Sequence, residues 1–449
     1  MSDGESNPAS AAGVLGPLLR SALGAELPFR LRFWDGSVTG PHDAPATLTI
    51  GRRRALRRLL WAPNEIGLAR AYVTGDLDVE GDLFAVLADV LALIRPDEIV
   101  GKRPSVRILA ALAAAALRLR VLGPPPRPPK EEVRLRGRRH TRRRDAEAIA
   151  HHYDVGNDFY RAVLGDSMTY SCAYWAAPEF DPAEPADLTA AQFAKCDLVA
   201  RKLGLTAGMR VLDVGCGWGT FALHAARTYG VHVVGVTLSA AQAEYARKRM
   251  ADEGVADLVE IRVQDYREVS DGPFDAICSI GMAEHVGASQ LAGYAAHLFD
   301  LLRPQGRLLN HAISLRPDDP QQGPESSSFI DRYVFPDGEL VPIARMVAIL
   351  EDAGFEVRDT ESLREHYGLT LRAWVTNLER KWDVAVAAAT PVRARVWRLY
   401  MTACALAFEA NEIGVNQVLA VRPGPRGESG MPLTRERLLG LDARGPSAG

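Results

Sequence analysis

The sharpest chemical signal in the sequence is a glycine-rich turn between a strand pattern and a helix pattern. It reads Val211-Leu-Asp-Val-Gly-Cys-Gly-Trp-Gly219, so an apolar run leads into three glycines at alternate positions. Glycine tolerates a tight turn and lets the backbone approach a bound ligand closely. The spacing is GxGxG, whereas the dinucleotide fingerprint is GxGxxG. The turn predicts a nucleotide-type cofactor pocket, and a plain strand-to-helix turn is the simpler alternative.

Polar residues near this turn narrow the kind of cofactor. Asp213, two residues before the first glycine, fits a methyltransferase better than a dehydrogenase. Gln264-Asp265-Tyr266 follows an expected strand, at the spacing where methyltransferases contact adenine through an acid and an aromatic face. The run Gly235-Val-Thr-Leu-Ser239 has no acidic residue where most such sheets hold the ribose, which leaves Thr237 and Gln242 for that contact.

Strand and helix patterns alternate around these motifs, which predicts a parallel, doubly wound sheet. Residues from about 320 to 415 look mostly helical, and the run Gln417 to Val421 is a candidate edge strand. The expected strands are 210–214, 231–236, 259–263, 274–280 and 307–313, and the expected helices are 219–229, 240–253 and 291–302.

Size and composition fit a multidomain globular protein. The chain has 449 residues, 47% hydrophobic and 24% charged, with a net charge of −3, which argues against a protein that is basic throughout. Its five cysteines stand singly without a CxxC pair, which is neither a disulfide framework nor a zinc site and suits a reducing cytosol. We therefore expect a cytoplasmic protein without a metal.

The N-terminal part predicts a smaller mixed domain with contacts to a membrane surface. Residues 29–34 and 47–50 look like strands, and residues 53–60 and 65–73 look like helices. The most apolar helical stretch, 108–117, is about half the length that spans a bilayer. We expect domains at 1–122 and 145–425, a proline- and arginine-rich linker at 123–144, and a flexible tail at 426–449.

Two arginine-rich runs, 52–58 and 134–144, are candidates for anionic headgroup contact, and a solvated charged face is the plain alternative. We expect no nucleic acid partner, because no aromatic stacking platform or recognised module accompanies the arginines.

A series of motifs from residue 148 onward resembles the cyclopropane-fatty-acyl-phospholipid synthases and the related mycolic acid cyclopropane synthases. The resemblance covers nearly 300 residues in the expected order, and Ala71-Tyr-Val-Thr-Gly-Asp-Leu-Asp78 extends it loosely to the N-terminal part. The other matching segments are 152–159, 168–175, the glycine-rich turn, 235–239, 280–287, 329–336, His366-Tyr367, Trp374, and the surroundings of Cys404 and Phe408.

The resemblance implies an α/β fold, a Rossmann-like class I S-adenosylmethionine-dependent methyltransferase with a helical insertion beside the smaller N-terminal domain. It also implies methyl transfer to the cis double bond of a phospholipid acyl chain, with S-adenosylmethionine and bicarbonate as cofactors. The implied cofactor contacts are Tyr153, Tyr170, Ser171, Gly215, Gly217, Thr237, Leu238, Gln242 and Tyr266, beside Asp213 and Asp265. The implied bicarbonate cluster is Cys172, Glu284, His311, Ile313 and Tyr367, with Cys404 nearby.

The implied chemistry explains these residue types. An alkene is a weak nucleophile, so alignment and a dry pocket are needed, and the resulting carbocation needs a nearby negative charge and a base. Each residue also has a plain alternative: His311 as a satisfied core histidine, Glu284-His285 as a helix cap, and Cys404 as a small core residue.

The product stays open between a cyclopropane and a 10-methylene branch, with a slight preference for the methylene, which would need a reductase partner to become a methyl branch. We expect peripheral association with the inner face of the cell membrane, and lipid positioning or homodimer contacts for the N-terminal domain. The runner-up functions are a small-molecule C-methyltransferase and a non-catalytic lipid- or cofactor-binding relative.

Overall fold

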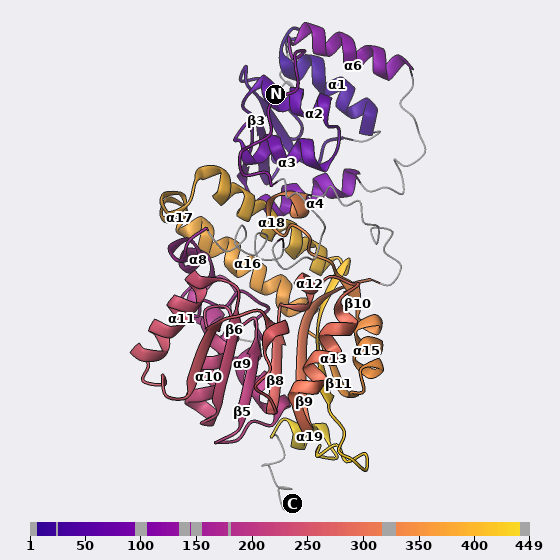
Figure 1. Cartoon of the computed structure of the whole chain (residues 1–449). Helices are drawn as coiled ribbons and strands as arrows, with labels where there is room; N and C mark the ends of the chain where they lie inside the picture. Colours follow the sequence, from indigo (N-terminus) through magenta and orange to yellow (C-terminus); the bar gives the residue numbers. More distant parts are fainter. Residues whose placement is uncertain are drawn as a thin grey trace, which may run out of the picture. The chain divides into compact units, whose positions relative to one another are not determined.

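The computed structural model describes residues 7–23, 26–94, 106–133, 144, 155–177, 181–316 and 329–440. These residues form two compact units, which are described separately (Figure 1). The N-terminal unit contains the described residues up to 133 together with residues 329–334 and 390–406. The main unit contains the rest. Two later segments of the chain therefore pack with the N-terminal residues, an association that the sequence patterns do not reveal.

The N-terminal unit is built on a four-stranded sheet in the order β2-β1-β3-β4. Its first two strands form a hairpin with a turn at Asp35-Gly36, where Phe33 N–H donates to Ser37 O at 2.9 Å. β1 runs parallel to β3, and β3 runs antiparallel to β4. The elements are α1 (Ala11–Leu23), β1 (Arg30–Phe33), β2 (Val38–Thr39), β3 (Ala46–Ile50), α2 (Arg53–Trp61), α3 (Glu65–Val73), β4 (Leu77–Gly81), α4 (Leu83–Ile94) and α6 (Val106–Arg118).

Arginines bind the later segments to this unit. In α18 (Pro391–Glu409), the Arg395 guanidinium donates to Tyr72 O at 2.7 Å and to Asp78 Oδ1 at 2.9 Å. Next to α14 (Phe329–Tyr333), the N–H of Val133 donates to Arg332 O at 2.8 Å. The motif Ala71–Asp78 therefore supplies acceptors for a helix that lies more than 300 residues later in the sequence.

The main unit is built on a larger sheet in the order β11-β12-β9-β8-β5-β6-β7, with β10 paired to β9. The strands from β9 to β7 run parallel, and their central members are almost entirely buried, as expected for a sheet covered on both faces. The strands are β5 (Arg210–Val214), β6 (His232–Thr237), β7 (Val259–Val263), β8 (Phe274–Ile280), β9 (Leu302–Leu315), β10 (Val341–Pro342), β11 (Glu356–Ser362) and β12 (Ile413–Val421).

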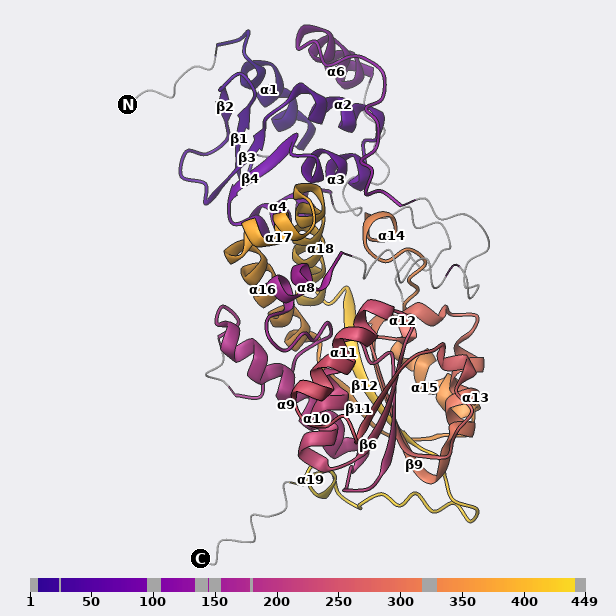
Figure 2. The same cartoon turned by 60° about the vertical axis from the view of Figure 1, so that its left-hand side comes forward.

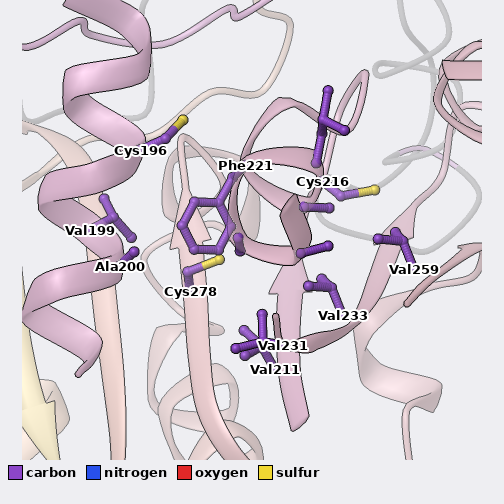
Figure 3. Packing of buried hydrophobic residues seen from close by; sticks show 14 of the residues in the cluster. Cys196, Val199, Ala200, Val211, Cys216, Phe221, Val231, Val233, Val259 and Cys278 are labelled. Atoms are coloured by element: carbon purple, nitrogen blue, oxygen red, sulfur yellow. The ribbon is translucent and has the colours of Figure 1, made fainter. Parts of the chain in front are cut away.

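Helices cover both faces of this sheet, as Figures 1 and 2 show. The core on one face is formed with α9 (Pro185–Leu203), α10 (Thr220–Tyr229) and α11 (Ala240–Asp252). The core on the other face is formed with α12 (Ala283–Val286), α13 (Leu291–Leu301) and α15 (Ile343–Asp352). In the first core, Val199 and Ala200 of α9 point toward Phe221 and Cys278 (Figure 3). This three-layer arrangement confirms the expected Rossmann-like methyltransferase fold.

A separate group of helices stands beside the sheet in the main unit and corresponds to the expected helical insertion. It consists of α8 (Asn157–Leu164), α16 (Arg364–Arg380) and α17 (Trp382–Ala388), which pack against one another. Asn377 of α16 donates from its side-chain amide to Val163 O of α8 at 3.0 Å. α16 is amphipathic enough to bury Tyr367, Leu371 and Trp374 on one side. Helix α16 carries the predicted site residue Tyr367 and also Trp374, which belongs to the segments that match the family.

Two expectations for the C-terminal part of the sheet are wrong. The run 417–421 belongs to β12, which is an interior strand paired antiparallel to both β9 and β11. The edge strand is β11, which falls inside a region expected to be mostly helical. β11 reads Glu-Val-Arg-Asp-Thr-Glu-Ser and has only one apolar residue, so it lacks the apolar pattern that marks a buried strand. The sheet is therefore mixed at this side rather than wholly parallel.

Candidate active site

The glycine-rich turn forms the floor of a pocket at the carboxyl end of β5. Gly215, Gly217 and Gly219 have φ values of 78°, 54° and 78°, a region that other residue types rarely adopt. The N–H groups of Gly215 and Cys216 both donate to Val236 O, at 2.9 and 3.0 Å. A side chain at Gly219 would also clash with Met250, whose Cε lies 2.8 Å from the position of an added Cβ. The turn is thus shaped by backbone requirements that only glycine meets.

Every predicted cofactor contact that the structure describes lines this pocket. Tyr153 lies outside the described residues, so its prediction stays untested. The pocket-lining residues among the predicted set are Tyr170, Ser171, Asp213, Gly215, Gly217, Thr237, Leu238, Gln242, Asp265 and Tyr266.

Hydrogen bonds hold the polar side of the pocket in place. Thr237 Oγ1 donates to Gln242 Oε1 at 3.0 Å, and Ser239 caps α11 by accepting from the N–H of Gln242. The Asp265 carboxylate accepts from the Arg267 guanidinium, with Oδ2 at 2.6 Å from Nη2. The Thr237–Gln242 pair therefore stands where a ribose-binding acid is missing from the sequence.

Asp213 is a buried acid with spare hydrogen-bonding capacity. Its Oδ1 accepts from the Cys278 thiol at 3.3 Å, whereas its Oδ2 has no polar partner among the described residues. Burial raises the pKa of Asp213 to about 6, against the opposing effects of the Cys278 hydrogen bond and the Lys195 charge. A carboxylate left open in a dry pocket suits a cationic ligand group.

Glu284 lies beyond the end of β8, on the short helix α12. Its Oε1 accepts from the N–H of Ile313 at 2.8 Å, and its Oε2 has no partner in the described part of the chain. Burial raises the pKa of Glu284 to about 7, although the backbone hydrogen bonds work in the opposite direction. One carboxylate oxygen of Glu284 is therefore available for a further hydrogen bond.

His311 lies two residues before Ile313 on β9, and therefore on the same face of the sheet. Its Nδ1 lies 3.3 Å from the Gln417 amide nitrogen, and its Nε2 has no partner among the described residues. Burial lowers the pKa of His311 to about 3, and the charges of Lys195 and Lys202 add to the effect. The lowered pKa favours the neutral ring, and Nε2 is available for a further hydrogen bond.

Cys172 and Tyr367 meet at one backbone carbonyl. The Cys172 thiol lies 3.6 Å from Leu363 O, and the N–H of Tyr367 donates to the same oxygen at 3.1 Å. The N–H of Leu363 donates in turn to Val415 O, and Val415 pairs with Ile313 between β12 and β9. These contacts connect the segments that carry Cys172, Tyr367 and Ile313, and Ile313 in turn donates its N–H to Glu284.

Aromatic rings connect the pocket with this cluster. Tyr170, which lines the pocket, lies 5.3 Å from Trp374 between ring centroids, and Trp374 lies 6.0 Å from Tyr367. On the far side, Tyr367 packs against Phe408 at 4.7 Å. The wall offers the faces of Tyr170 and Trp374, whereas Tyr174 packs on His366 at 4.8 Å between ring centroids. Trp374 is therefore better placed than Tyr174.

Cys404 belongs to the part of α18 that packs in the N-terminal unit. It is buried, and burial raises the pKa of its thiol to about 12, so the thiol is a poor nucleophile. Its assignment to the cluster remains a prediction. No group of metal-ligating side chains occurs among the described residues.

Sequence reasoning missed several residues that line the pocket. Trp218 anchors the turn by donating from Nε1 to Asn157 Oδ1 at 2.8 Å, and Met282 and His285 flank Glu284. Lys195 of α9 is 1% exposed and donates to Ser171 Oγ at 3.0 Å. A lysine on the apolar face of Ala191–Ala200 was the available signal, because lysine is rarely buried without a role.

The arrangement separates two tasks. One pocket can hold an adenosyl ligand along the glycine-rich turn, and a second group of buried polar atoms lies beyond an aromatic wall. The second group includes an acid, a neutral histidine and unsatisfied acceptors, which suits charge stabilisation and proton removal. Such a division is expected for group transfer onto an apolar substrate.

Comparison with known proteins gives a consistent result. Residues 140–418 match the family model described as mycolic acid cyclopropane synthetase. The chain is 43% identical to the probable fatty acid methyltransferase Rv3720 of Mycobacterium tuberculosis, covering 90% of this chain and 94% of the relative. It is 33% identical to the tuberculostearic acid methyltransferase UfaA1 of the same organism, covering 93% of each.

A solved structure agrees with these relatives. The mycolic acid cyclopropane synthase CmaA1, complexed with S-adenosylhomocysteine and CTAB, matches 62% of this chain and 98% of its own at 32% identity and a TM-score of 0.57.

Proposed function

This chain belongs to the mycolic acid cyclopropane synthetase family of S-adenosylmethionine-dependent methyltransferases, and we propose that it methylates the cis double bond of an unsaturated acyl chain in a phospholipid. The observation that carries the proposal is the position of Glu284 and His311. Each has a buried polar atom without a partner in the described structure; Glu284 follows β8, and His311 lies on the neighbouring strand β9. A small-molecule methyltransferase has no evident need for such a cluster behind an aromatic wall.

The side chains around the pocket supply alignment and a dry environment. The alkene is a weak nucleophile, so catalysis depends on holding its double bond in line with the sulfonium methyl group and excluding water. As the carbon–carbon bond forms, positive charge appears on the acyl chain. The face of Trp374, which is fully buried, and the ring of Tyr367 are suited to stabilise that charge.

The buried cluster fits a bicarbonate ion. The unpartnered Oε2 of Glu284 can accept a hydrogen bond from a bound hydroxyl group. If the Gln417 amide donates to His311 Nδ1, the proton of the neutral ring lies on Nε2, which can then donate to an anionic oxygen. The Tyr367 hydroxyl is a third candidate to hold the ion. When bound, bicarbonate would supply a general base for the proton that leaves the transferred methyl group.

Two products share these groups. Proton loss with ring closure gives a cyclopropane, whereas a hydride shift before proton loss gives a methylene branch. We favour the methylene branch, because the relatives that cover at least nine tenths of this chain are named fatty acid methyltransferases. The cyclopropane synthase structure covers only 62% of it. A methylene product would require a separate reductase to become a methyl branch.

Mass spectrometry tests the proposal. The protein is incubated with S-adenosylmethionine and dioleoyl phosphatidylglycerol vesicles, and the acyl chains are analysed as methyl esters. The expected result is a gain of one CH2 unit, with an exocyclic methylene in the olefinic NMR spectrum. A cyclopropane signal would reverse the product assignment, and no gain with S-adenosylhomocysteine still bound would overturn the phospholipid substrate.

The N-terminal unit has a surface that suits a membrane. Six of the ten large apolar side chains that are exposed in the described structure lie between Leu60 and Leu122. Trp61 is 58% exposed and donates from Nε1 to the carbonyl of Gly123, next to the exposed Leu122. Apart from Arg118, the exposed described residues of α6 are apolar: Ala110, Leu112, Ala113, Ala114 and Leu117. We call Trp61, Leu112, Leu117 and Leu122 the apolar surface.

Positive charge surrounds the apolar surface. The chain from 106 to 130 contains five basic residues and no acidic residue. Exposed tryptophan and leucine beside arginine is the combination that anchors a protein in an anionic interface. We propose that this surface docks on the inner face of the cell membrane. The described residues contain no helix long and apolar enough to cross it. Most of the run 134–144 lies outside the described residues.

Vesicle flotation tests this docking. We expect Leu117→Glu combined with Leu122→Glu to lower binding to anionic vesicles more than tenfold, whereas Leu433→Glu, at a residue 93% exposed in the main unit, leaves binding unchanged. High salt should also weaken wild-type binding. Equal binding of both variants would contradict the proposal. A change from dimer to monomer in sedimentation without vesicles would show that the surface binds a second copy instead.

A further inference from the structure

Helix α9 carries two buried lysines with different partners. Lys202 is fully buried, and its Nζ pairs with Glu361 Oε2 at 2.5 Å and Asp359 Oδ2 at 3.3 Å. Lys195, two turns earlier, is 1% exposed, and its Nζ donates to the hydroxyl oxygen of Ser171 at 3.0 Å. Within the described residues Lys195 has no carboxylate at ion-pair distance. One helix therefore buries one neutralised ammonium and one without a counter-ion.

The position of Lys195 explains why its charge is tolerable. It lines the cofactor pocket together with Ser171. A buried ammonium without a counter-ion is unfavourable, unless a ligand brings the negative charge. Because Ser171 Oγ accepts from Lys195, the hydroxyl hydrogen of Ser171 remains available to donate. Gln192 fixes the same segment by donating from Nε2 to Ser171 O at 2.9 Å. Two donors are thus held at one end of the pocket.

An acid faces the same pocket. Asp213 is 3% exposed, and its Oδ2 has no partner in the described part of the chain. Lys195 acts on Asp213 electrostatically, but the two do not form an ion pair. A buried lysine and a buried aspartate that are kept apart match a ligand group that carries both charges, which is the zwitterionic amino-acid end of S-adenosylmethionine.

We infer that Lys195 is the residue that binds the α-carboxylate of the methionine end of S-adenosylmethionine, assisted by Ser171, while Asp213 faces its α-ammonium. Lys195 then distinguishes a ligand with an amino-acid end from the many nucleosides that share its adenosine part. This assignment rests on the identity of the cofactor and does not depend on the acyl substrate or the product.

Ligands that lack parts of the amino acid isolate the contact. We expect wild-type protein to bind S-adenosylhomocysteine much more tightly than 5′-methylthioadenosine, which has no amino-acid end, or the decarboxylated analogue. In Lys195→Met, calorimetry should show a 10- to 100-fold loss for S-adenosylhomocysteine, the range for a charged hydrogen bond. Binding of methylthioadenosine and of the decarboxylated analogue should stay within about twofold, since neither carries the carboxylate.

The matched control is Lys202→Met. It removes the other buried ammonium of α9 and should lower thermal stability without changing the ratio of the affinities for S-adenosylhomocysteine and methylthioadenosine. Retained methylthioadenosine binding shows that the pocket of Lys195→Met is folded. Equal losses for all three ligands would show that Lys195 only positions Ser171 and the surrounding segment, and unchanged binding of S-adenosylhomocysteine would remove it from the site. Either result overturns the inference.

Discussion

The Asp76 carboxylate of the N-terminal unit and the Asp213 and Glu284 carboxylates of the main unit differ in their hydrogen-bond partners. In the N-terminal unit, the Asp76 carboxylate accepts from Arg54, Arg58 and Thr74. Burial opposes its ionisation, yet these hydrogen bonds outweigh burial and lower the pKa of Asp76. In the main unit, Asp213 and Glu284 each keep one oxygen without a partner among the described residues, and burial raises their pKa values to about 6 and 7.

Glu132 shows the same contrast at a junction between chain segments. It accepts from Arg70 at 2.6 Å, from Arg332 at 2.9 Å and from the Tyr333 hydroxyl at 2.9 Å. These hydrogen bonds outweigh the effect of burial and lower its pKa to about 2. We call a carboxylate fully bonded when both of its oxygens have hydrogen-bond partners, and partly bonded when one oxygen has none among the described residues. Fully bonded carboxylates hold distant segments together, whereas partly bonded carboxylates retain binding capacity for a ligand. The comparison separates structural charges from functional charges without any knowledge of the reaction.

The largest effect should follow from removing the charge of a partly bonded carboxylate. We expect Glu284→Gln to reduce turnover by about 10²- to 10⁴-fold, because the amide cannot take the place of a carboxylate near a developing cation and a proton acceptor. The rate is measured as transfer of a labelled methyl group to lipid at saturating cofactor. Since Glu284 does not line the cofactor pocket, the affinity for S-adenosylhomocysteine should stay within about twofold.

Thr237→Val serves as the opposite control for this variant, since it alters the pocket and should raise the dissociation constant of S-adenosylhomocysteine. Wild-type turnover in Glu284→Gln would remove that residue from the mechanism and weaken the distinction between the two classes of acid.

A fully bonded carboxylate should contribute to the stability of the fold rather than to cofactor binding. We expect Glu132→Ala to lower the free energy of unfolding by about 3 kcal/mol, because it leaves two arginines and a tyrosine hydroxyl without their acceptor. The change is measured by urea unfolding followed by circular dichroism, and cofactor affinity should not change. Glu80→Ala is the matched control, since the Arg32–Glu80 pair is exposed and should contribute less than about 1 kcal/mol. Similar losses in both variants would contradict the assignment.

The sequence predicted the parts of this molecule in which local pattern and structure coincide. Strands 210–214, 259–263 and 274–280 have the expected bounds, because 210–214 and 274–280 are mainly apolar and 259–263 alternates apolar and charged residues. The pocket could also be found, because the backbone of the glycine-rich turn admits only glycine. Five residues of the second cluster came from resemblance, and no local pattern would have joined Cys172 to Tyr367 across nearly 200 residues.

Other features depend on pairing over long distances and leave little trace in sequence. β11 was missed because an edge strand needs no apolar face, and β12 was misplaced because antiparallel pairing is not encoded in its composition. Glu132 is fully bonded only with the contribution of Arg332, which is 200 residues away in the sequence. The sequence does not separate Lys195 from Lys202, because both are buried lysines of α9 and only their partners, Ser171 and Glu361, differ.

The smallest effect should appear in the pH dependence of cofactor binding. The free protein has an Asp213 pKa of about 6, raised by burial, and the ligand ammonium requires the charged form. Above pH 6 the carboxylate is already ionised. Below pH 6 the Asp213 carboxyl group is protonated and must lose its proton before the ligand ammonium can bind. The affinity for S-adenosylhomocysteine should therefore fall about tenfold for each further pH unit. Calorimetry between pH 5 and pH 8 measures this slope.

Two controls assign the slope to Asp213. 5′-Methylthioadenosine has no ammonium, so its affinity should vary little over the same range and corrects for other titrating groups. Asp213→Asn should bind S-adenosylhomocysteine more weakly at pH 8 and lose the slope, because the amide does not titrate. A slope that persists in Asp213→Asn would assign it to another group. Asp213 would then be a buried acid that stays protonated with ligand bound. The contrast with the fully bonded carboxylates would in that case depend on Glu284 alone.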